Sequence, residues 1–265
     1  PPRSTPKPSS AASDVYKRQI VPIVIDMLNL VPSFQHHWQA YGFWAPAIDD
    51  YVDQNIMAWM GSPEESALHK IVEPYNYRRQ LTLPKLIINA TGDEFFLPTS
   101  SQFYFNDLLG EKHLRYVPNA RHNLSRTDAM QTLLAYYHTI LTDTPRPQFV
   151  WSFEDDGSIL VKSDEPPVAA TLWSAINTTN RDFRVDTIGR SWISEPLIPI
   201  EQTVYQARPT APKRGWKAFL VEMTYSTSLD IPMKLTTAVR VLPDTLPHPY
   251  VAPKWPAEGF IRNKL

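Results

Sequence analysis

Residues 85–124 constrain the fold of this chain more than any other stretch. A short apolar run at residues 86–88 predicts a strand that is buried on both faces, and residues 113–117 predict a second one. Between them, Pro98 and the hydroxyl residues after it are start signals for a helix that Gly110 would end. A strand, a crossover helix and a strand of this length predict one parallel unit of an α/β protein, in which both strands end at the same edge of the sheet.

A carboxylate and an imidazole follow these two strands. Asp93 comes directly after the first strand and His122 after the second, so we expect the two side chains to face each other. A carboxylate that is hydrogen-bonded to an imidazole nitrogen orients the ring and stabilises its charged form, as in the acid and base of a catalytic triad. Glu94 is the alternative acid, because it stands four residues before Pro98. An aspartate at a strand end and a histidine in a loop are also common without any catalytic role.

The sequence contains no candidate nucleophile of the kind that such a sheet uses. In hydrolases built on parallel sheets the chain order is serine, acid and base, and the serine lies in a G-x-S-x-G turn after an earlier strand. None of the eight glycines builds that motif, and the chain has no cysteine. We therefore expect the acid and the base of a triad without the attacking hydroxyl.

Composition argues against several classes of function. The formal net charge of -1 argues against a general binder of nucleic acid or of acidic membranes. The longest apolar run, Ile20 to Ile25, is far too short to cross a bilayer, and its β-branched residues predict a central parallel strand despite Pro22. Without cysteine, disulfides and thiolate zinc sites are excluded. His36 and His37 diverge on a helix and lack a third ligand at useful spacing, so we expect them to pack rather than to bind a metal, and we expect no cofactor.

The pattern along the chain predicts two domains between two tails. Residues 1–19 lack periodicity and the features of a signal peptide and resemble translated adapter sequence, so we expect a non-native or disordered tail. Residues 20–143 predict a partial α/β domain, with a helical, aromatic-rich insertion at residues 33–80 as a lid over the sheet edge. Residues 148–243 are short alternating segments separated by turns, which predict a small antiparallel β-sandwich, and residues 244–265 predict an extended tail.

Two helices can be predicted in detail. Ser62 to Glu65 forms a capping box with proline at the first helical position. After His122, the segment Ser125 to Asp128 again gives a start pattern, and the helix that follows would end near Asp143. Its apolar residues share one face, which we expect to pack on the sheet: Met130, Leu133, Leu134, Tyr137, Ile140 and Leu141.

Three blocks of sequence, taken in order, resemble a known family. They are Ile20-Val-Pro-Ile-Val-Ile-Asp-Met-Leu-Asn29, Ala90-Thr-Gly-Asp-Glu-Phe-Phe-Leu-Pro98 and Leu114-Arg-Tyr-Val-Pro-Asn-Ala-Arg-His-Asn123. On these blocks the chain is similar, from about Ile20 to Leu242, to the PhoPQ-activated pathogenicity-related protein family.

The resemblance implies the C-terminal part of an α/β-hydrolase sheet with an appended β domain. It also implies that Asp93 and His122 are the acid and the base. The family's serine block, G-x-S-K-R-G-W, would lie upstream of Ile20 and is absent here. Residues 213–216 repeat its last four letters, but Pro212 stands at the serine position and the segment lies among predicted β-strands.

The implied parent protein is an exported serine hydrolase, periplasmic or extracellular, that acts as an esterase or a peptidase on a small ester or peptide. This chain, which lacks the nucleophile, would be inactive. The alternative is a non-catalytic secreted binding or signalling protein on a hydrolase scaffold, with the β-sandwich as the surface for a partner protein.

Overall fold

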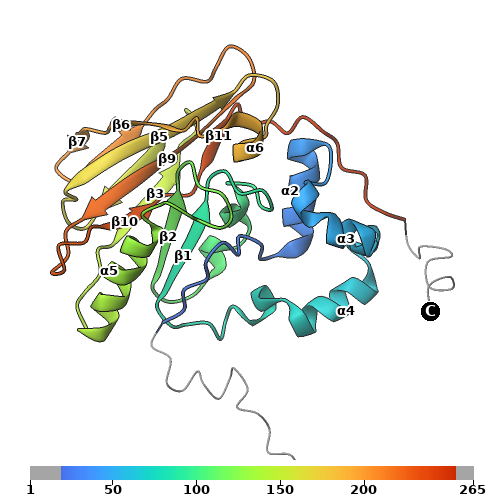
Figure 1. Cartoon of the computed structure of the whole chain (residues 1–265), viewed down its shortest axis with the longest axis horizontal. Helices are drawn as coiled ribbons and strands as arrows, with labels where there is room; N and C mark the ends of the chain where they lie inside the picture. The colour runs from blue at the N-terminus through green and yellow to red at the C-terminus, as the bar shows by residue number, and fades with distance from the viewer. Residues whose placement is uncertain (1–18, 255–265) are drawn as a thin grey trace, which may run out of the picture.

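The computed structural model describes residues 19–254 and shows a mixed α/β protein with one parallel and two antiparallel sheets (Figure 1). The predicted tail at residues 1–19 lies, except for its last residue, outside the described part, as does the end of the predicted C-terminal tail. Within the described part, every helix is too short or too polar to cross a bilayer.

The parallel sheet has two strands, β1 (Lys85–Ala90) and β2 (Lys112–Val117), which end level with each other because Ala90 lies opposite Val117. The prediction of a third regular strand at residues 20–25 is wrong. This segment makes only two isolated parallel bridges to β1, through Ile20 and Ile23. Pro22 has no N–H to donate, and Val24 adopts a positive φ of 54°, so a continuous ladder cannot form.

The crossover between β1 and β2 also differs from the prediction. Instead of one α-helix it contains two short 3-10 helices, η4 (Ser100–Phe103) and η5 (Phe105–Asp107). Between them Tyr104 has an extended φ of −146°. The Tyr104 hydroxyl bonds to the Asp26 carboxylate, whereas the Phe105 ring stacks on Trp151 in the β region at 5.2 Å. The non-helical backbone at Tyr104 therefore divides the crossover into two short helices, and these two contacts fix the neighbouring side chains.

The helices before β1 lie together on one side of the parallel sheet, at the right of Figure 1. They have a small core of their own around Phe34, Ile48 and Met60. The predicted capping box is confirmed in part, because Ser62 Oγ accepts a hydrogen bond from Glu65 N at 3.0 Å, but the Glu65 carboxylate accepts from Gly61 N instead of Ser62 N. The elements are α2 (Leu30–Tyr41), η1 (Pro46–Ile48), α3 (Asp49–Asp53), η2 (Ile56–Trp59), α4 (Pro63–Val72) and η3 (Pro74–Tyr77).

Helix α5 (Ala129–Leu141) follows β2, but its start and its buried face differ from the prediction. It begins at Ala129, because Asp128 makes ion pairs with Arg115 and Lys234 instead of capping the helix. Most of the predicted apolar face is exposed: Met130 59%, Leu134 47%, Tyr137 46% and Leu141 60%. The buried side chains are mostly smaller ones: Ala129, Thr132, Ala135, Tyr136, Thr139 and Ile140. Small residues let the helix approach β1 and β10 closely.

The remaining strands form two antiparallel sheets, as predicted for the C-terminal part. One has the order β3-β4-β8-β7, and the other has the order β10-β9-β5-β6 with β11 also paired to β9. The prediction for residues 148–243 did not include the short helix α6, which lies between β5 and β6. The bounds are β3 (Phe149–Phe153), β4 (Ile159–Ser163), β5 (Ala169–Asn177), α6 (Val185–Ile188), β6 (Ile193–Pro196), β7 (Pro199–Glu201), β8 (Val204–Ala207), β9 (Trp216–Tyr225), β10 (Met233–Thr236) and β11 (Arg240–Leu242).

The parallel and antiparallel parts share one continuous core. Side chains from β1, β2, α5 and both antiparallel sheets pack in it, including Leu86, Val117, Tyr136, Val161 and Val221. Because apolar burial is the main stabilising contribution to folding, the β region and the parallel sheet stabilise each other. The division at residues 143–148 stays a prediction.

Candidate functional site

The turns after β1 and β2 bring Asp93 and His122 together, as predicted. Asp93 Oδ2 lies 2.9 Å from His122 Nδ1, and Oδ1 of the same carboxylate lies 3.2 Å from it. The two turns are also joined through the backbone, because Gly92 N donates to Ala120 O at 3.1 Å. The pair therefore stands at the carboxyl edge of two parallel strands, whereas its catalytic role stays a prediction.

The surroundings of Asp93 fix its carboxylate and perturb its charge. The residue is 2% exposed, and Oδ1 accepts hydrogen bonds from Phe95 N at 2.8 Å and from Phe96 N at 3.3 Å. Burial raises the pKa of Asp93 to about 6, while these N–H groups and His122 oppose the rise. The Phe95 ring lies 4.4 Å from the His122 ring, so both partners of the pair are held in place.

Glu94, the alternative acid, contacts the same histidine at a different place. Its Oε2 accepts a hydrogen bond from the backbone N of His122 at 3.0 Å. The imidazole ring itself pairs with Asp93. Glu94 therefore holds the turn that carries His122, and the geometry favours Asp93 as the group that orients the ring.

Asp26 is a second buried carboxylate near this pair, and it was not predicted as a site residue. Asp26 accepts hydrogen bonds from the hydroxyl of Tyr104 at 2.6 Å and from the hydroxyl of Tyr116 at 2.5 Å. Burial raises its pKa to about 7, the two hydroxyls oppose that rise, and the charge of Asp93 adds to it. The signal in the sequence was an aspartate directly after the apolar run at residues 20–25.

Asp26 should make the stability of the protein depend on pH. Its folded pKa lies above the ordinary 3.8, so between about pH 4 and pH 7 the folded protein keeps a proton that the unfolded chain has lost. Stability should therefore fall as pH rises through this window, by up to about 4 kcal/mol from this group. In Asp26→Asn the fall in the free energy of unfolding, measured by urea denaturation across the window, should be smaller by about that amount. The exposed Asp53→Asn is the control, and an unchanged slope in Asp26→Asn would contradict the prediction.

An open cavity of about 460 Å³ lies beside His122. Most of its lining is apolar and comes from the segment at residues 20–25, from β1 and from the outer face of α5, including Ile23, Ile88, Met130 and Leu133. Within residues 19–254, no serine or threonine hydroxyl bonds to His122, whose hydrogen-bonded ring nitrogen is Nδ1. The lack of an attacking hydroxyl stays a prediction.

The sequence matches a family of known proteins. The profile of the PhoPQ-activated pathogenicity-related protein family matches residues 9–184, which include Asp93 and His122. The chain belongs to this family. The match begins ahead of the boundary that we expected at Ile20.

A curated relative extends the similarity of this family member beyond residue 184. The chain is 36% identical over 255 residues to autocrine proliferation repressor protein A of Dictyostelium discoideum, and the match covers 86% of this chain. It covers 52% of the relative, so the chain spans about half of that protein's length. No solved structure matches the chain.

His36 and His37 pack in the protein interior, as we expected. His36 Nε2 lies 3.0 Å from Thr99 Oγ1, and His37 Nε2 accepts a hydrogen bond from Ala45 N at 3.1 Å. Burial lowers the pKa of each ring to about 3. Both rings are thus neutral at physiological pH, and their hydrogen bonds tie α2 to the segments around Thr99 and Ala45.

Proposed function

We propose that this family member carries the acid and the base of a serine hydrolase, an esterase or a peptidase, whose attacking serine belongs to a segment outside this sequence. The observation that carries the proposal is the hydrogen bond of 2.9 Å between Asp93 Oδ2 and His122 Nδ1. It stands where the acid and the base of an α/β-hydrolase stand, after successive parallel strands and in the same chain order.

The chemistry follows from the orientation of the ring. Asp93 accepts a hydrogen bond from the Nδ1–H group of His122, so the second ring nitrogen, Nε2, has a free lone pair that can take a proton from a hydroxyl. When Nε2 becomes protonated, the buried carboxylate stabilises the imidazolium until the proton passes to the leaving group. In the proposed mechanism this pair acts as a proton relay, and acyl transfer also needs an attacking oxygen near Nε2 and an oxyanion hole.

The free edge of the segment at residues 20–25 is where a further strand could bring that oxygen. The backbone hydrogen bonds to the β1 side are made by Ile20, Pro22 and Val24. The backbone N–H and C=O groups of the residues between them, Val21 and Ile23, therefore point away from β1. No described residue pairs with them. Ile23 and Val24 line the cavity beside His122, so a parallel strand along this edge would end close to the base.

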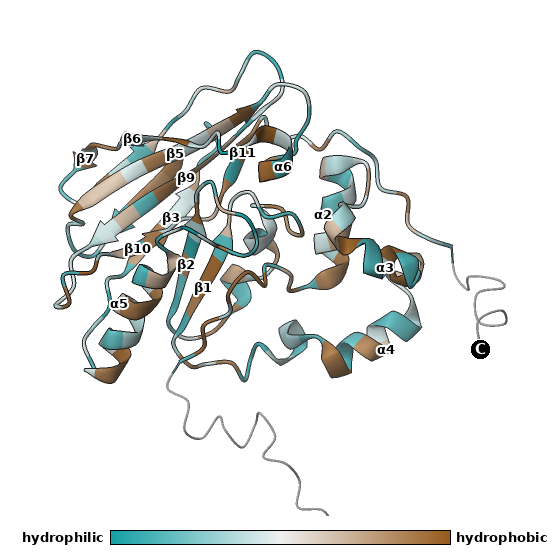
Figure 2. Ribbon diagram, viewed as in Figure 1, coloured by the Kyte–Doolittle hydropathy of each residue, from teal (hydrophilic) through white to brown (hydrophobic). Residues whose placement is uncertain are grey.

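Exposed apolar side chains on α4 and α5 also support the proposal. Figure 2 shows hydrophobic stretches along α4 and α5, the helices on either side of the sheet. On α4, Leu68 is 55% and Ile71 is 72% exposed, in addition to the outer face of α5. Exposed apolar side chains gathered on one face of a helix mark a surface that another element covers. Further strands and helices of a hydrolase sheet would bury it.

A second candidate function is a non-catalytic secreted signalling protein on the same scaffold. The observation in its favour is the name of the relative in Dictyostelium discoideum, which describes repression of proliferation and no reaction. The consecutive strands β6 and β7 would then be the contact surface for a partner protein. Three isoleucines there are more than half exposed: Ile193, Ile198 and Ile200. Both candidates assign the protein to the outside of the cell, an assignment that rests on resemblance to the family.

A fluorophosphonate probe separates the two candidates. In a protein extended to the full length of its relative we expect covalent labelling of one serine, and loss of that labelling in His122→Ala, because the hydroxyl then has no base. His138→Ala, a histidine on α5 that bonds to Ser228, should leave labelling unchanged. The chain of 265 residues alone should remain unlabelled. A folded full-length protein without labelling would support the signalling protein instead.

A further inference from the structure

The loop between β5 and β6 reaches from the β region to the edge of the parallel sheet that carries Asp93 and His122. It spans residues 178–192 and contains the short helix α6. Figure 1 shows α6 beside the ends of β1 and β2 and next to α2. The family resemblance assigns no role to this loop, which contacts both turns of the candidate site.

The contact with the Asp93 turn is a close backbone approach. Val185 N donates to Gly92 O at 3.0 Å, one residue before the acid. A Cβ atom at position 92 would lie 2.5 Å from Val185 Cγ2, so any side chain larger than hydrogen would push α6 away from the turn. The glycine before the acid therefore permits the close approach of this loop.

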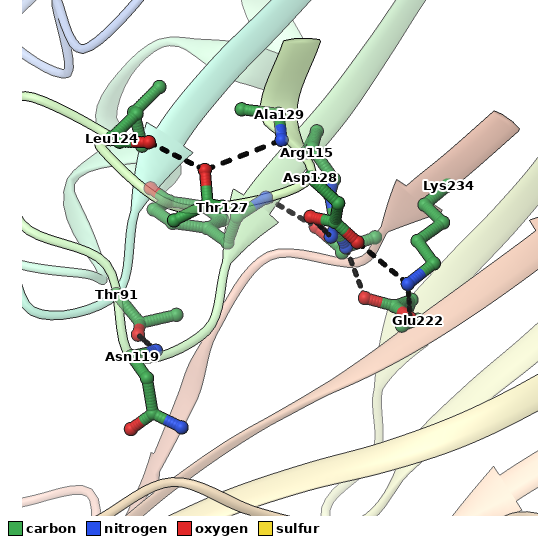
Figure 3. Close-up of polar contacts among 11 residues, drawn as sticks. Thr91, Arg115, Asn119, Leu124, Thr127, Asp128, Ala129, Glu222 and Lys234 are labelled. Atoms are coloured by element: carbon green, nitrogen blue, oxygen red, sulfur yellow. Dashed lines mark hydrogen bonds and ion pairs between the residues drawn. The ribbon is translucent and has the colours of Figure 1, made fainter. Parts of the chain in front are cut away.

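The contact with the His122 turn is a paired hydrogen bond. Asn119 Nδ2 donates to Trp192 O at 2.8 Å, and Asn119 Oδ1 accepts from Trp192 N at 2.9 Å. The backbone N of Asn119 also donates to Thr91 Oγ1 at 3.1 Å, and Figure 3 shows these two residues side by side below the start of α5. One asparagine thus joins the histidine turn, the aspartate turn and the loop from the β region.

The loop is itself held in one conformation by a buried carboxylate. Asp182 is 2% exposed and accepts hydrogen bonds from the backbone and guanidinium of Arg184 and from Thr187 Oγ1 at 2.7 Å. The Arg184 guanidinium also lies 5.1 Å from the Tyr41 ring of α2. Since the loop is fixed at this end and by strands β5 and β6, it can act as a fixed support for the two turns.

We propose that the loop at residues 178–192 positions the acid and the base, with Asn119 and Gly92 as the positioning residues through which it acts. The β region is then part of the site, because its loop sets the distance between Asp93 and His122. This inference rests on the proposed relay, but its readout is the hydrogen bond itself and needs no activity.

The test measures how fast the Nδ1 proton of His122 exchanges with water, by NMR on the chain of 265 residues, with His122→Ala to assign the signal. Asn119→Gly removes both bonds to Trp192 and keeps a residue that accepts the positive φ of 59° at this position. We expect exchange at least about tenfold faster, because opening of the pair becomes easier. Asn55→Gly changes an asparagine of similar φ, 57°, in the turn between α3 and η2, and it should leave the exchange rate unchanged.

A second variant tests the contact between the loop and the Asp93 turn. Gly92→Ala should also speed the exchange, and adding Val185→Ala should restore part of the protection, since it removes the atom nearest the new Cβ. A merely structural role would lower the unfolding midpoint without this rescue. Unchanged exchange in folded Asn119→Gly and Gly92→Ala would overturn the inference and leave the relay intact. No protected proton in the unmodified chain would overturn the relay as well.

Discussion

Asp93→Asn, in a protein extended to the full length of its relative, is expected to lower the rate of acyl transfer about 10⁴-fold. The reason lies in the hydrogen bonds of the carboxylate. Oδ1 accepts from Phe95 N and Phe96 N, so the oxygen of an asparagine amide would stay there and its NH₂ would face His122. The imidazole would then have to accept at Nδ1 and carry its proton on Nε2. In that tautomer the ring cannot take a proton from the serine.

The measurement is kcat/KM for hydrolysis of an activated ester, compared between Asp93→Asn and Glu94→Gln. A glutamine at position 94 keeps an oxygen that can accept from His122 N, so most of the activity should remain. If Glu94→Gln lost as much activity as we expect for Asp93→Asn, and Asp93→Asn lost little, Glu94 would be the acid. Folding of each variant is checked by its unfolding midpoint.

The pairing of Asp93 with His122 could be predicted because it depends on a local rule. Two parallel strands joined by a short crossover end at the same edge, so the residues that follow them meet. The core of each strand was equally clear, since β1 is buried along its whole length. Where the same rule was applied to residues 20–25, Pro22 and the positive φ of Val24 prevented a regular strand.

The parts that were predicted wrongly depend on what packs against what. The spacing of Met130, Leu134 and Leu141 shows correctly that they share a face of α5, but periodicity cannot tell which face meets the core. The narrow space beside β1 and β10 selected the face with Ala135 and Thr132 instead. Asn119 and Trp192 are 73 residues apart, and no pattern in either segment indicates the other. Such contacts arise only when the β region docks on the sheet.

That docking also depends on a buried ion-pair network, shown in Figure 3, which links β2 to β9 and β10. Arg115 is 1% exposed and donates to Glu222 Oε2 and, at 2.9 Å, to Asp128 Oδ1. Lys234 Nζ donates to Asp128 Oδ2 at 2.7 Å and lies 3.7 Å from Glu222 Oε1. Asp128 ends the segment that begins at His122, so the network fixes the C-terminal end of that segment.

Arg115→Met should destabilise the protein by about 3 kcal/mol, because Glu222 stays buried, loses the hydrogen bond from the guanidinium and keeps only the longer ion pair with Lys234. Urea denaturation gives the free energy of unfolding. Arg208→Met, at an exposed pair with Asp156, is the matched control and should change it little. The double variant with Glu222→Leu should recover much of the loss, since no unpaired buried charge remains. If the losses of Arg115→Met and Glu222→Leu, measured singly, simply added in the double variant, the two residues would not act as a unit in the docking of the β region.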